Sequence, residues 1–145
     1  MEEITANLWI GAAPSARELP DDHRFGHVLT LGYFDRLGYE LPPASDTGDQ
    51  FVFPDSPDHE YTQFAAAVDH LRKRLREPAN CPVLVHCQAG ISRSCAVCTA
   101  ALAVERELSF DIAYRLVEDA RPKVDPIPSL RQSARQYISD HIGGT

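Results

Sequence analysis

The stretch that decides the fold is Val83-Leu84-Val85-His86-Cys87-Gln88-Ala89-Gly90-Ile91-Ser92-Arg93-Ser94. Its first three residues form a short apolar run that predicts a fully buried strand. The residues from Ser92 to Glu107 are almost wholly apolar through the middle and predict a helix buried on most sides. Gly90 gives the turn between them the backbone freedom that it needs. A strand, a tight turn and a helix therefore follow one another, with Cys87 at the end of the strand.

This turn is suited to binding an oxyanion. It leaves successive backbone N–H groups unpaired at a helix N-terminus, and such a nest accepts a tetrahedral anion. We expect a phosphate to be bound there by Gln88, Ala89, Gly90, Ile91, Ser92 and Arg93. Arg93 adds a planar fork of donors that can hold two phosphate oxygens. Cys87 lies at the base of the nest, where the helix N-terminus and Arg93 favour its thiolate, an in-line nucleophile.

Short strands and helices alternate along the rest of the chain. We expect strands over Ile4–Ile10, Val28–Leu31 and Phe51–Phe53, and a long loop from Tyr33 to Gln50 that is rich in Gly, Pro, Asp and Ser. A helix follows, with a core-facing stripe at three-to-four-residue spacing. This stripe consists of Tyr61, Phe64, Val68, Leu71 and Leu75.

Two further helices are expected towards the C-terminus. Ser109 can cap the first of them, with Asp111 in its first turn. The inner face of this helix is predicted to consist of Ile112, Leu116, Val117 and Ala120. The last helix is predicted to begin near Pro126–Ser129 and to run to about His141.

The alternation of strands and helices indicates the fold class. It favours an α/β fold with a central, mostly parallel sheet flanked by helices on both faces. The 145 residues fit a single domain, 1–145. Ligands of such sheets bind beyond the carboxyl ends of the strands, which is where we expect both Asp55 and Cys87.

Composition excludes several classes of partner. The net charge of −7 argues against nucleic acid or an anionic membrane surface as the main partner. No apolar run approaches the roughly 20 residues of a membrane-spanning helix. The acidic Met1-Glu2-Glu3 start lacks the features of a signal peptide. We therefore expect a cytoplasmic monomer without a membrane partner.

The cysteines do not predict a metal site. Cys81, Cys87, Cys95 and Cys98 are expected to be free thiols in a cytoplasmic chain. Cys95 and Cys98 form a Cys-x-x-Cys, but within the apolar helix this pattern indicates buried packing and not zinc. We expect no metal and no cofactor, because Arg93 and the nest can neutralise a phosphate.

The signature resembles a known family. His86-Cys87, five residues, and Arg93-Ser94 resemble the His-Cys-x5-Arg-Ser signature of the cysteine-based protein tyrosine phosphatase superfamily, and most closely its dual-specificity branch. Leu8-Trp9-Ile10-Gly11 is similar to that family's opening strand, and Phe53-Pro54-Asp55-Ser56-Pro57 to its general-acid loop. The resemblance runs from about Ile4 to Ile138. The chain departs from the family at Pro126-Ile127 and Ser133-Ala134, where a Pro-Asn and a Gln-Leu pair are common.

The resemblance implies a protein tyrosine phosphatase-like fold and a role for each matching residue. Cys87 would attack phosphorus and form a cysteinyl-phosphate. Asp55 would protonate the leaving oxygen and then deprotonate the hydrolytic water, with Asp58 as the alternative acid. Arg93 would stabilise the equatorial oxygens, and Ser94 would donate a hydrogen bond to the departing thiolate. His86 would support the loop from behind, whereas we expect His59 and His70 at the surface.

The implied substrates are phosphoproteins carrying phosphotyrosine and also phosphoserine or phosphothreonine. Alternatives within the same design are a phosphoinositide phosphatase, an RNA 5′-phosphatase or a rhodanese-type sulfur transferase. The loop lacks the lysine typical of phosphoinositide phosphatases, and the acidic chain does not suit RNA as a substrate. A sulfur transferase needs no acid like Asp55. The alternative outside catalysis is a phosphate-binding pseudophosphatase, which would usually have lost Cys87 or Asp55.

Overall fold

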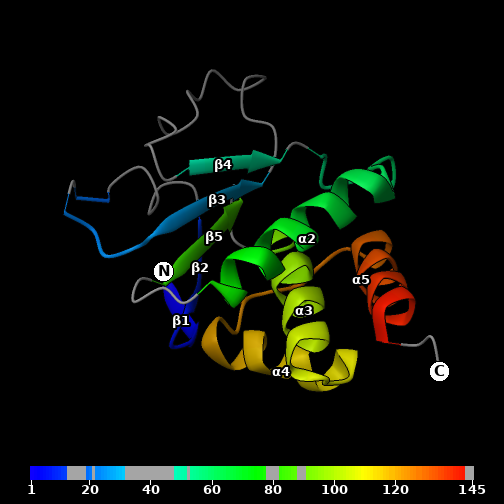
Figure 1. Ribbon diagram of the computed structural model, residues 1–145. Helices are drawn as coiled ribbons and strands as arrows, with labels where there is room; N and C mark the ends of the chain where they lie inside the picture. The colour runs from blue at the N-terminus through cyan, green and yellow to red at the C-terminus, as the bar shows by residue number, and fades with distance from the viewer. Residues whose placement is uncertain are drawn as a thin grey trace.

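The computed structural model of the chain describes residues 1–12, 19–20, 22–31, 48–51, 53–77, 82–87 and 91–142. Their strands are β1 (Glu2–Thr5), β2 (Leu8–Ala12), β3 (His27–Leu31), β4 (Gly48–Phe51) and β5 (Val83–Cys87). Their helices are α2 (Tyr61–Arg76), α3 (Arg93–Arg106), α4 (Phe110–Ala120) and α5 (Pro128–Ile142). Figure 1 shows the helices gathered beside the sheet. None of the described helices is long and apolar enough to cross a membrane.

The described strands form one five-stranded sheet in the order β1-β2-β5-β3-β4. Strand β5 lies in the middle and pairs in parallel with β2 and β3, while β4 adds in parallel to β3. Strand β1 pairs antiparallel with β2. The α/β class and the mostly parallel sheet are therefore confirmed. The carboxyl ends of four parallel strands meet at one edge, which is where the β5 strand delivers Cys87.

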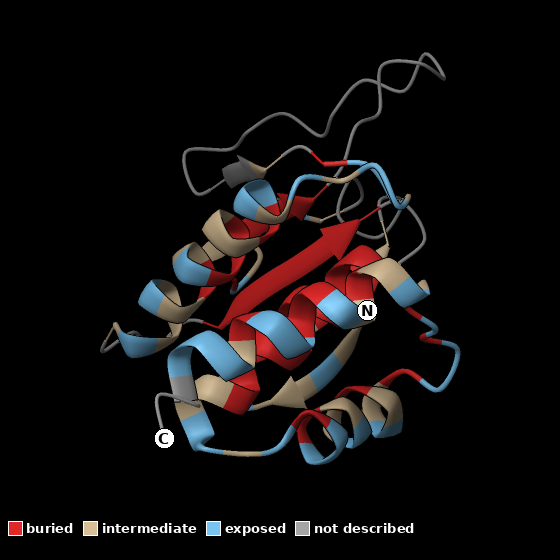
Figure 2. Cartoon of the chain, turned by 90° about the vertical axis from the view of Figure 1, so that its right-hand side faces the viewer, coloured by how far each residue is buried: buried red, intermediate tan, exposed pale blue. Residues whose placement is uncertain are grey.

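Side chains along each strand alternate between the two faces of the sheet, because the strand repeat is two residues. One face belongs to the main core, to which the strands contribute Leu8, Ile10, Leu29, Leu31, Val83, Val85 and Cys87. Helices α2, α3 and α4 contact strands, and α5 packs on α3. The opposite face carries Trp9, Val28 and Leu84, which pack with Leu19 and Phe25. Figure 2 shows that the burial is concentrated in the central strands and on the inward sides of the helices.

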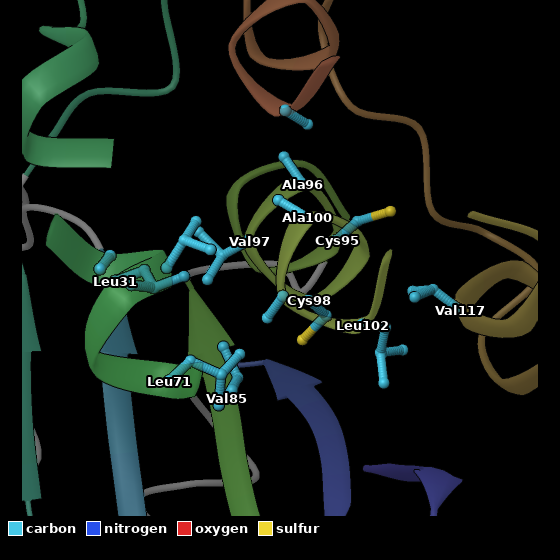
Figure 3. Close-up of a cluster of buried hydrophobic side chains, with 14 of the residues drawn as sticks. Leu31, Leu71, Val85, Cys95, Ala96, Val97, Cys98, Ala100, Leu102 and Val117 are labelled. Carbon is cyan, nitrogen blue, oxygen red and sulfur yellow. The ribbon is translucent and has the colours of Figure 1, made fainter. Parts of the chain in front are cut away.

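Helix α3 lies at the centre of the helical layer. Every residue from Arg93 to Ala103 is buried, and the helix contacts α2, α4 and α5 as well as β2 and β5. In Figure 3, Cys98 points from α3 towards the sheet beside Val85, whereas Cys95 points to another side of the helix. The prediction of a central buried helix is confirmed, and its first two residues are Arg93 and Ser94.

The helices around α3 follow the predicted pattern with one exception. In α2, Phe64, Val68 and Leu71 are fully buried, and the partly buried Tyr61 and Leu75 pack against the same core. The side chain of Ser109 accepts a hydrogen bond from Ile112 N at 3.3 Å and caps α4 as expected. For the inner face of α4, the prediction of Val117 is confirmed, but the other predicted residues are wrong.

The buried residues of α4 are Phe110, Ala113 and Val117, whereas Ile112 is 56% exposed. Residues 110, 113 and 117 recur at helical spacing, so Phe110 sets the phase of the buried face and turns Ile112 outwards. Leu116 and Ala120, which were also predicted to lie on the inner face, are only partly buried.

Two strand predictions are also corrected. The single strand expected over Ile4–Ile10 is a hairpin of β1 and β2, because residues 6 and 7 form a turn in which Thr5 Oγ1 donates to Asn7 Oδ1 at 2.8 Å. The strand expected over Phe51–Phe53 instead spans Gly48–Phe51, since its register pairs Val28 with Gly48 and Leu31 with Phe51. Three residues assigned to the long loop are thus in a strand, and residues 33–47 of that loop lie outside the described residues.

Candidate active site

Cys87 is the last residue of the central strand β5, and its side chain is only 3% exposed. Its Sγ lies 3.2 Å from Oγ of Ser94, the second residue of α3, which is fully buried. The strand and the helix thus bring together two of the predicted site residues. A hydroxyl at this distance can donate a hydrogen bond to the sulfur. Gln88, Ala89 and Gly90 lie outside the described residues, so the amide nest remains a prediction.

Arg93 opens helix α3 and is 7% exposed. Its Nη1 donates a hydrogen bond to the carbonyl oxygen of Phe53 at 3.2 Å. The buried Nε–H has no hydrogen-bond partner among the described residues. A buried cation with a spare donor is costly unless an anion or acceptor meets it. The arrangement suits a guanidinium that completes its hydrogen bonds with a bound oxyanion.

Asp55 lies in residues 53–60, which connect β4 to α2 and which we call the 53–60 loop. Phe53 is 1% exposed and packs edge-on against Phe64, with ring centroids 6.0 Å apart. Pro54 and Asp55 then turn out to solvent. The buried Phe53 therefore anchors an exposed carboxylate two residues further on. Because Phe53 also accepts the hydrogen bond from Arg93, Asp55 belongs to a loop that contacts the start of α3.

His86 lies on the opposite face of the sheet from Cys87, as the two-residue strand repeat requires. It is fully buried, and its Nε2 is 2.7 Å from Oγ1 of Thr30 on β3. Its side chain therefore fixes the end of β5 to the neighbouring strand. The supporting role that we expect for His86 agrees with this position and stays a prediction.

The other described cysteines differ sharply from a nucleophile. Cys95 and Cys98 are fully buried in α3. Burial raises the pKa of the Cys95 thiol to about 12 and raises the pKa of Cys98 well above its ordinary value. Both are therefore neutral thiols near pH 7. No cluster of three or more His, Cys, Asp or Glu side chains suited to a metal ion occurs in the described part of the chain.

Comparison with known proteins identifies the family. Residues 8–140 match the family described as Dual specificity phosphatase, catalytic domain. The chain belongs to this family. Dual specificity protein phosphatase 19 of Mus musculus is 42% identical over 139 residues, which cover 90% of this chain and 58% of that protein. Dual specificity protein phosphatase 9 of Homo sapiens is 30% identical over 134 residues, which cover 86% of this chain and 32% of that protein.

The dual specificity phosphatase fold is also found by structural comparison. The crystal structure of human DUSP28 superposes with a TM-score of 0.82 at 24% identity, and the match covers 100% of both chains. The protein tyrosine phosphatase-like fold expected from the signature is thus confirmed. The chain nevertheless spans only part of the curated relatives named above, 58% and 32% of their lengths.

The first departure from the family signature, Pro126-Ile127, lies beside the start of α3. The backbone N–H of Ile127 donates to Ser92 Oγ at 3.1 Å, and the N–H of Asp125 donates to the carbonyl oxygen of Ile91 at 3.0 Å. The side chain of Ser92 is therefore occupied by the connection between α4 and α5. The Ser92 hydroxyl accepts the bond from Ile127 and still has its own O–H to donate.

The second departure, Ser133-Ala134, lies in α5 and involves a histidine that was predicted wrongly. His59 is not a free surface residue: it is partly buried and its Nε2 lies 2.7 Å from Ser133 Oγ. Its Nδ1 lies 2.9 Å from the carbonyl oxygen of Ser56. The pair is separated by 74 residues, and nothing in the local sequence around either residue signals the contact. His70, also expected at the surface, is partly buried with its ring 5.3 Å from that of Phe51.

Proposed function

We propose that the chain is a cysteine-dependent phosphatase that hydrolyses phosphate monoesters on phosphoproteins through a cysteinyl-phosphate on Cys87. The observation that carries the proposal is the 3.2 Å contact between Cys87 Sγ and Ser94 Oγ at the start of α3. The adjacent Arg93 guanidinium supports it, because a buried cation with a spare Nε–H suits an anionic substrate. Membership of the dual specificity phosphatase family supports the same chemistry.

In the first step, the Cys87 thiolate attacks phosphorus in line with the bond to the leaving group. An S–P bond forms while the P–O bond to the leaving oxygen breaks. The Asp55 carboxyl gives its proton to that oxygen, so that a neutral alcohol or phenol departs. Arg93 and the amides of residues 88–92 stabilise the equatorial phosphate oxygens, where charge is spread in the transition state.

In the second step, water hydrolyses the cysteinyl-phosphate. The Asp55 carboxylate takes a proton from the water as its oxygen bonds to phosphorus. The S–P bond breaks, and the Cys87 thiolate leaves with the hydrogen bond from Ser94. Inorganic phosphate and the starting enzyme result, and no cofactor takes part in the balance.

The substrate class rests on the signature and on charge. The loop between Cys87 and Arg93 contains no cation that would bind the additional phosphates of a phosphoinositide. The net charge of −7 does not suit RNA. We therefore propose phosphotyrosine, phosphoserine and phosphothreonine in proteins as substrates. The cytoplasmic location and the monomeric state stay predictions.

The test combines an aryl phosphate assay with the variant Cys87→Ser. We expect this variant to lose turnover but to keep tungstate binding, because amides and Arg93 supply most contacts with the anion. Cys95→Ala is the matched control and should keep turnover, since that thiol is buried and neutral. Residual activity of more than a few per cent in Cys87→Ser would exclude the covalent mechanism.

Assays of the wild-type chain distinguish a protein phosphatase from a pseudophosphatase and from a phosphatase of RNA or lipid. Tungstate binding without any turnover would identify a phosphate-binding pseudophosphatase. Turnover of an RNA 5′-phosphate or a phosphoinositide well above that of phosphopeptides would replace the proposed substrate class but keep the mechanism.

A further inference from the structure

Backbone carbonyl groups on both sides of Asp55 form hydrogen bonds with side chains. One of these side chains, Arg93, comes from α3, and the other, His59, comes from the 53–60 loop itself. The carbonyl oxygen of Phe53 accepts from Arg93 Nη1 at 3.2 Å. The carbonyl oxygen of Ser56 lies 2.9 Å from His59 Nδ1 and also accepts from the His59 backbone N–H at 3.2 Å. Asp55 itself is exposed, so its position depends on these flanking backbone contacts more than on its own packing.

The imidazole of His59 is oriented by its two partners. The Ser56 carbonyl can only accept, so Nδ1 must carry the hydrogen of that bond. In neutral imidazole, Nε2 then accepts from the Ser133 hydroxyl, 2.7 Å away. In the protonated imidazole, Nε2 donates to the same hydroxyl. A serine can serve as donor or acceptor, so both hydrogen bonds are kept in either charge state.

The ring of His59 also lies beside two aromatic side chains. Its centroid lies 6.2 Å from that of Phe53 and 6.3 Å from that of Phe64. Phe64 belongs to α2 and is fully buried. The aromatic contacts and the two hydrogen bonds together leave the His59 side chain little freedom.

Helix α5 provides a rigid base for this link. Ser133 is 7% exposed, and Ala134 and Tyr137 on the same helix are fully buried. Helix α5 packs along α3, the helix that begins with Arg93 and Ser94. His59 therefore ties the 53–60 loop to the same pair of helices that positions the residues around Cys87.

We propose that His59 is a positioning residue, which through Ser133 fixes the backbone at Asp55 relative to α3 and so aims the carboxyl at the leaving-group oxygen. The inference rests on the proposed function, because it assumes that Asp55 is the proton donor. An error of about 1 Å in the placement of a reacting group can cost on the order of 100-fold in rate. A shift of this loop should therefore weaken protonation of the leaving group without weakening phosphate binding.

The test is a set of variants assayed with aryl phosphates whose leaving groups range from good to poor. Ser133→Ala removes the hydroxyl, and His59→Phe keeps a ring beside Phe53 and Phe64 but removes both side-chain hydrogen bonds of the imidazole. For poor leaving groups we expect each variant to lower kcat about 10-fold, which is less than the loss expected when the acid itself is removed. For good leaving groups, which hardly need a proton, kcat should stay near wild type, and KM should change little for either class.

The matched control is Ser129→Ala. Ser129 lies on α5 one turn before Ser133, and its buried Oγ has no hydrogen-bond partner among the described residues. This variant should behave as wild type with every substrate. His59→Gln, whose amide can still reach Ser133, should recover part of the loss seen in His59→Phe. Ser133→Ala added to His59→Phe should cause no further loss, since both remove the same link.

The outcomes separate this inference from the proposed function. In one outcome, the loss of kcat in Asp55→Asn grows as the leaving group becomes poorer, but Ser133→Ala shows no loss or the same loss for every leaving group. This outcome overturns only the positioning role. If the loss of kcat in Asp55→Asn does not depend on the leaving group, the assignment of Asp55 as the acid fails. Ser133→Ala added to Asp55→Asn should have no further effect, and an additional loss would show that Ser133 acts by another route. Thermal unfolding of each variant distinguishes these kinetic effects from loss of folded protein.

Discussion

The guanidinium of Arg93 donates a hydrogen bond to the main-chain carbonyl oxygen of Phe53 at 3.2 Å, although 40 residues separate the two in the sequence. Both residues are buried. The bond joins the start of α3 to the 53–60 loop, two residues before Asp55. Arg93 can therefore hold the loop with one nitrogen, while its buried Nε–H has no partner among the described residues. The cation and the proposed proton donor are coupled through this single side chain.

Replacement of Arg93 by lysine should impair the enzyme almost as much as replacement by alanine. Lysine keeps the charge but loses the planar fork, and it cannot bind two phosphate oxygens while also holding Phe53. We expect kcat to fall about 10²- to 10³-fold in both variants, the usual cost of removing a donor to transition-state charge. Kinetics with an aryl phosphate measure the effect. A near-wild-type kcat for Arg93→Lys would mean that Arg93 acts only through its positive charge.

Asp55→Asn should lower kcat about 10²- to 10⁴-fold for substrates with poor leaving groups, because proton donation to the leaving oxygen is lost. The loss should shrink as the leaving group improves. Asp58→Asn is the control within the same loop: Asp58 is also exposed, and its backbone N–H donates to Ser56 Oγ at 3.1 Å. If kcat instead fell in Asp58→Asn, more strongly for poorer leaving groups, and stayed unchanged in Asp55→Asn, Asp58 would be the acid.

Peroxide should inactivate the enzyme by oxidising Cys87 before Cys95 or Cys98. The thiolate is the reactive form, and burial raises the pKa of Cys95 to about 12. A raised pKa keeps that thiol protonated at every pH well below 12, so it reacts slowly at neutral pH. Mass spectrometry after brief exposure should find sulfenic acid at Cys87, and oxidation of Cys98 ahead of Cys87 would contradict the expectation.

The centre of the fold could be predicted because its signals are local. The β5 strand and the middle of helix α3 are apolar segments, and the sequence that joins them carries a recognisable signature. Ser109 and Asp111 mark the start of α4 by capping chemistry that acts within one turn. Sequence reasoning therefore placed Cys87 at the end of a strand, and Arg93 and Ser94 near the start of the following helix, where the structure has them.

The features that sequence reasoning missed depend on contacts between distant segments. Gly48 and Asp49 have low strand propensity, yet the ladder with β3 places them in β4. The turn at Ala6 and Asn7 has no glycine or proline to mark it. The link between His59 and Ser133 spans 74 residues and leaves no periodic pattern. Such pairings are set by tertiary packing, which a single sequence does not reveal.

Glu105 on α3 is expected to stabilise the fold in a pH-dependent way. It lies 2.7 Å from Arg72 Nε and 2.9 Å from Arg76 Nη2, both on α2. Burial alone would raise the pKa of Glu105, but hydrogen bonds and charge from the two arginines outweigh burial and leave the pKa lowered. A lowered pKa in the folded state means that the stabilisation is complete above the unfolded pKa of about 4.3 and is lost as the pH falls through the folded value.

Glu105→Gln should therefore lower the free energy of unfolding at pH 7 by about 1 kcal/mol, a magnitude typical of a partly exposed charged hydrogen bond. Chemical denaturation at pH 7 and at about pH 3 measures the effect, and the difference from wild type should shrink at the lower pH because Glu105 itself becomes protonated. Glu3→Gln, which changes an exposed glutamate on β1, is the control and should have little effect at either pH. A loss of equal size at both values would mean that Glu105 stabilises the contact between α2 and α3 by packing and not by its charge.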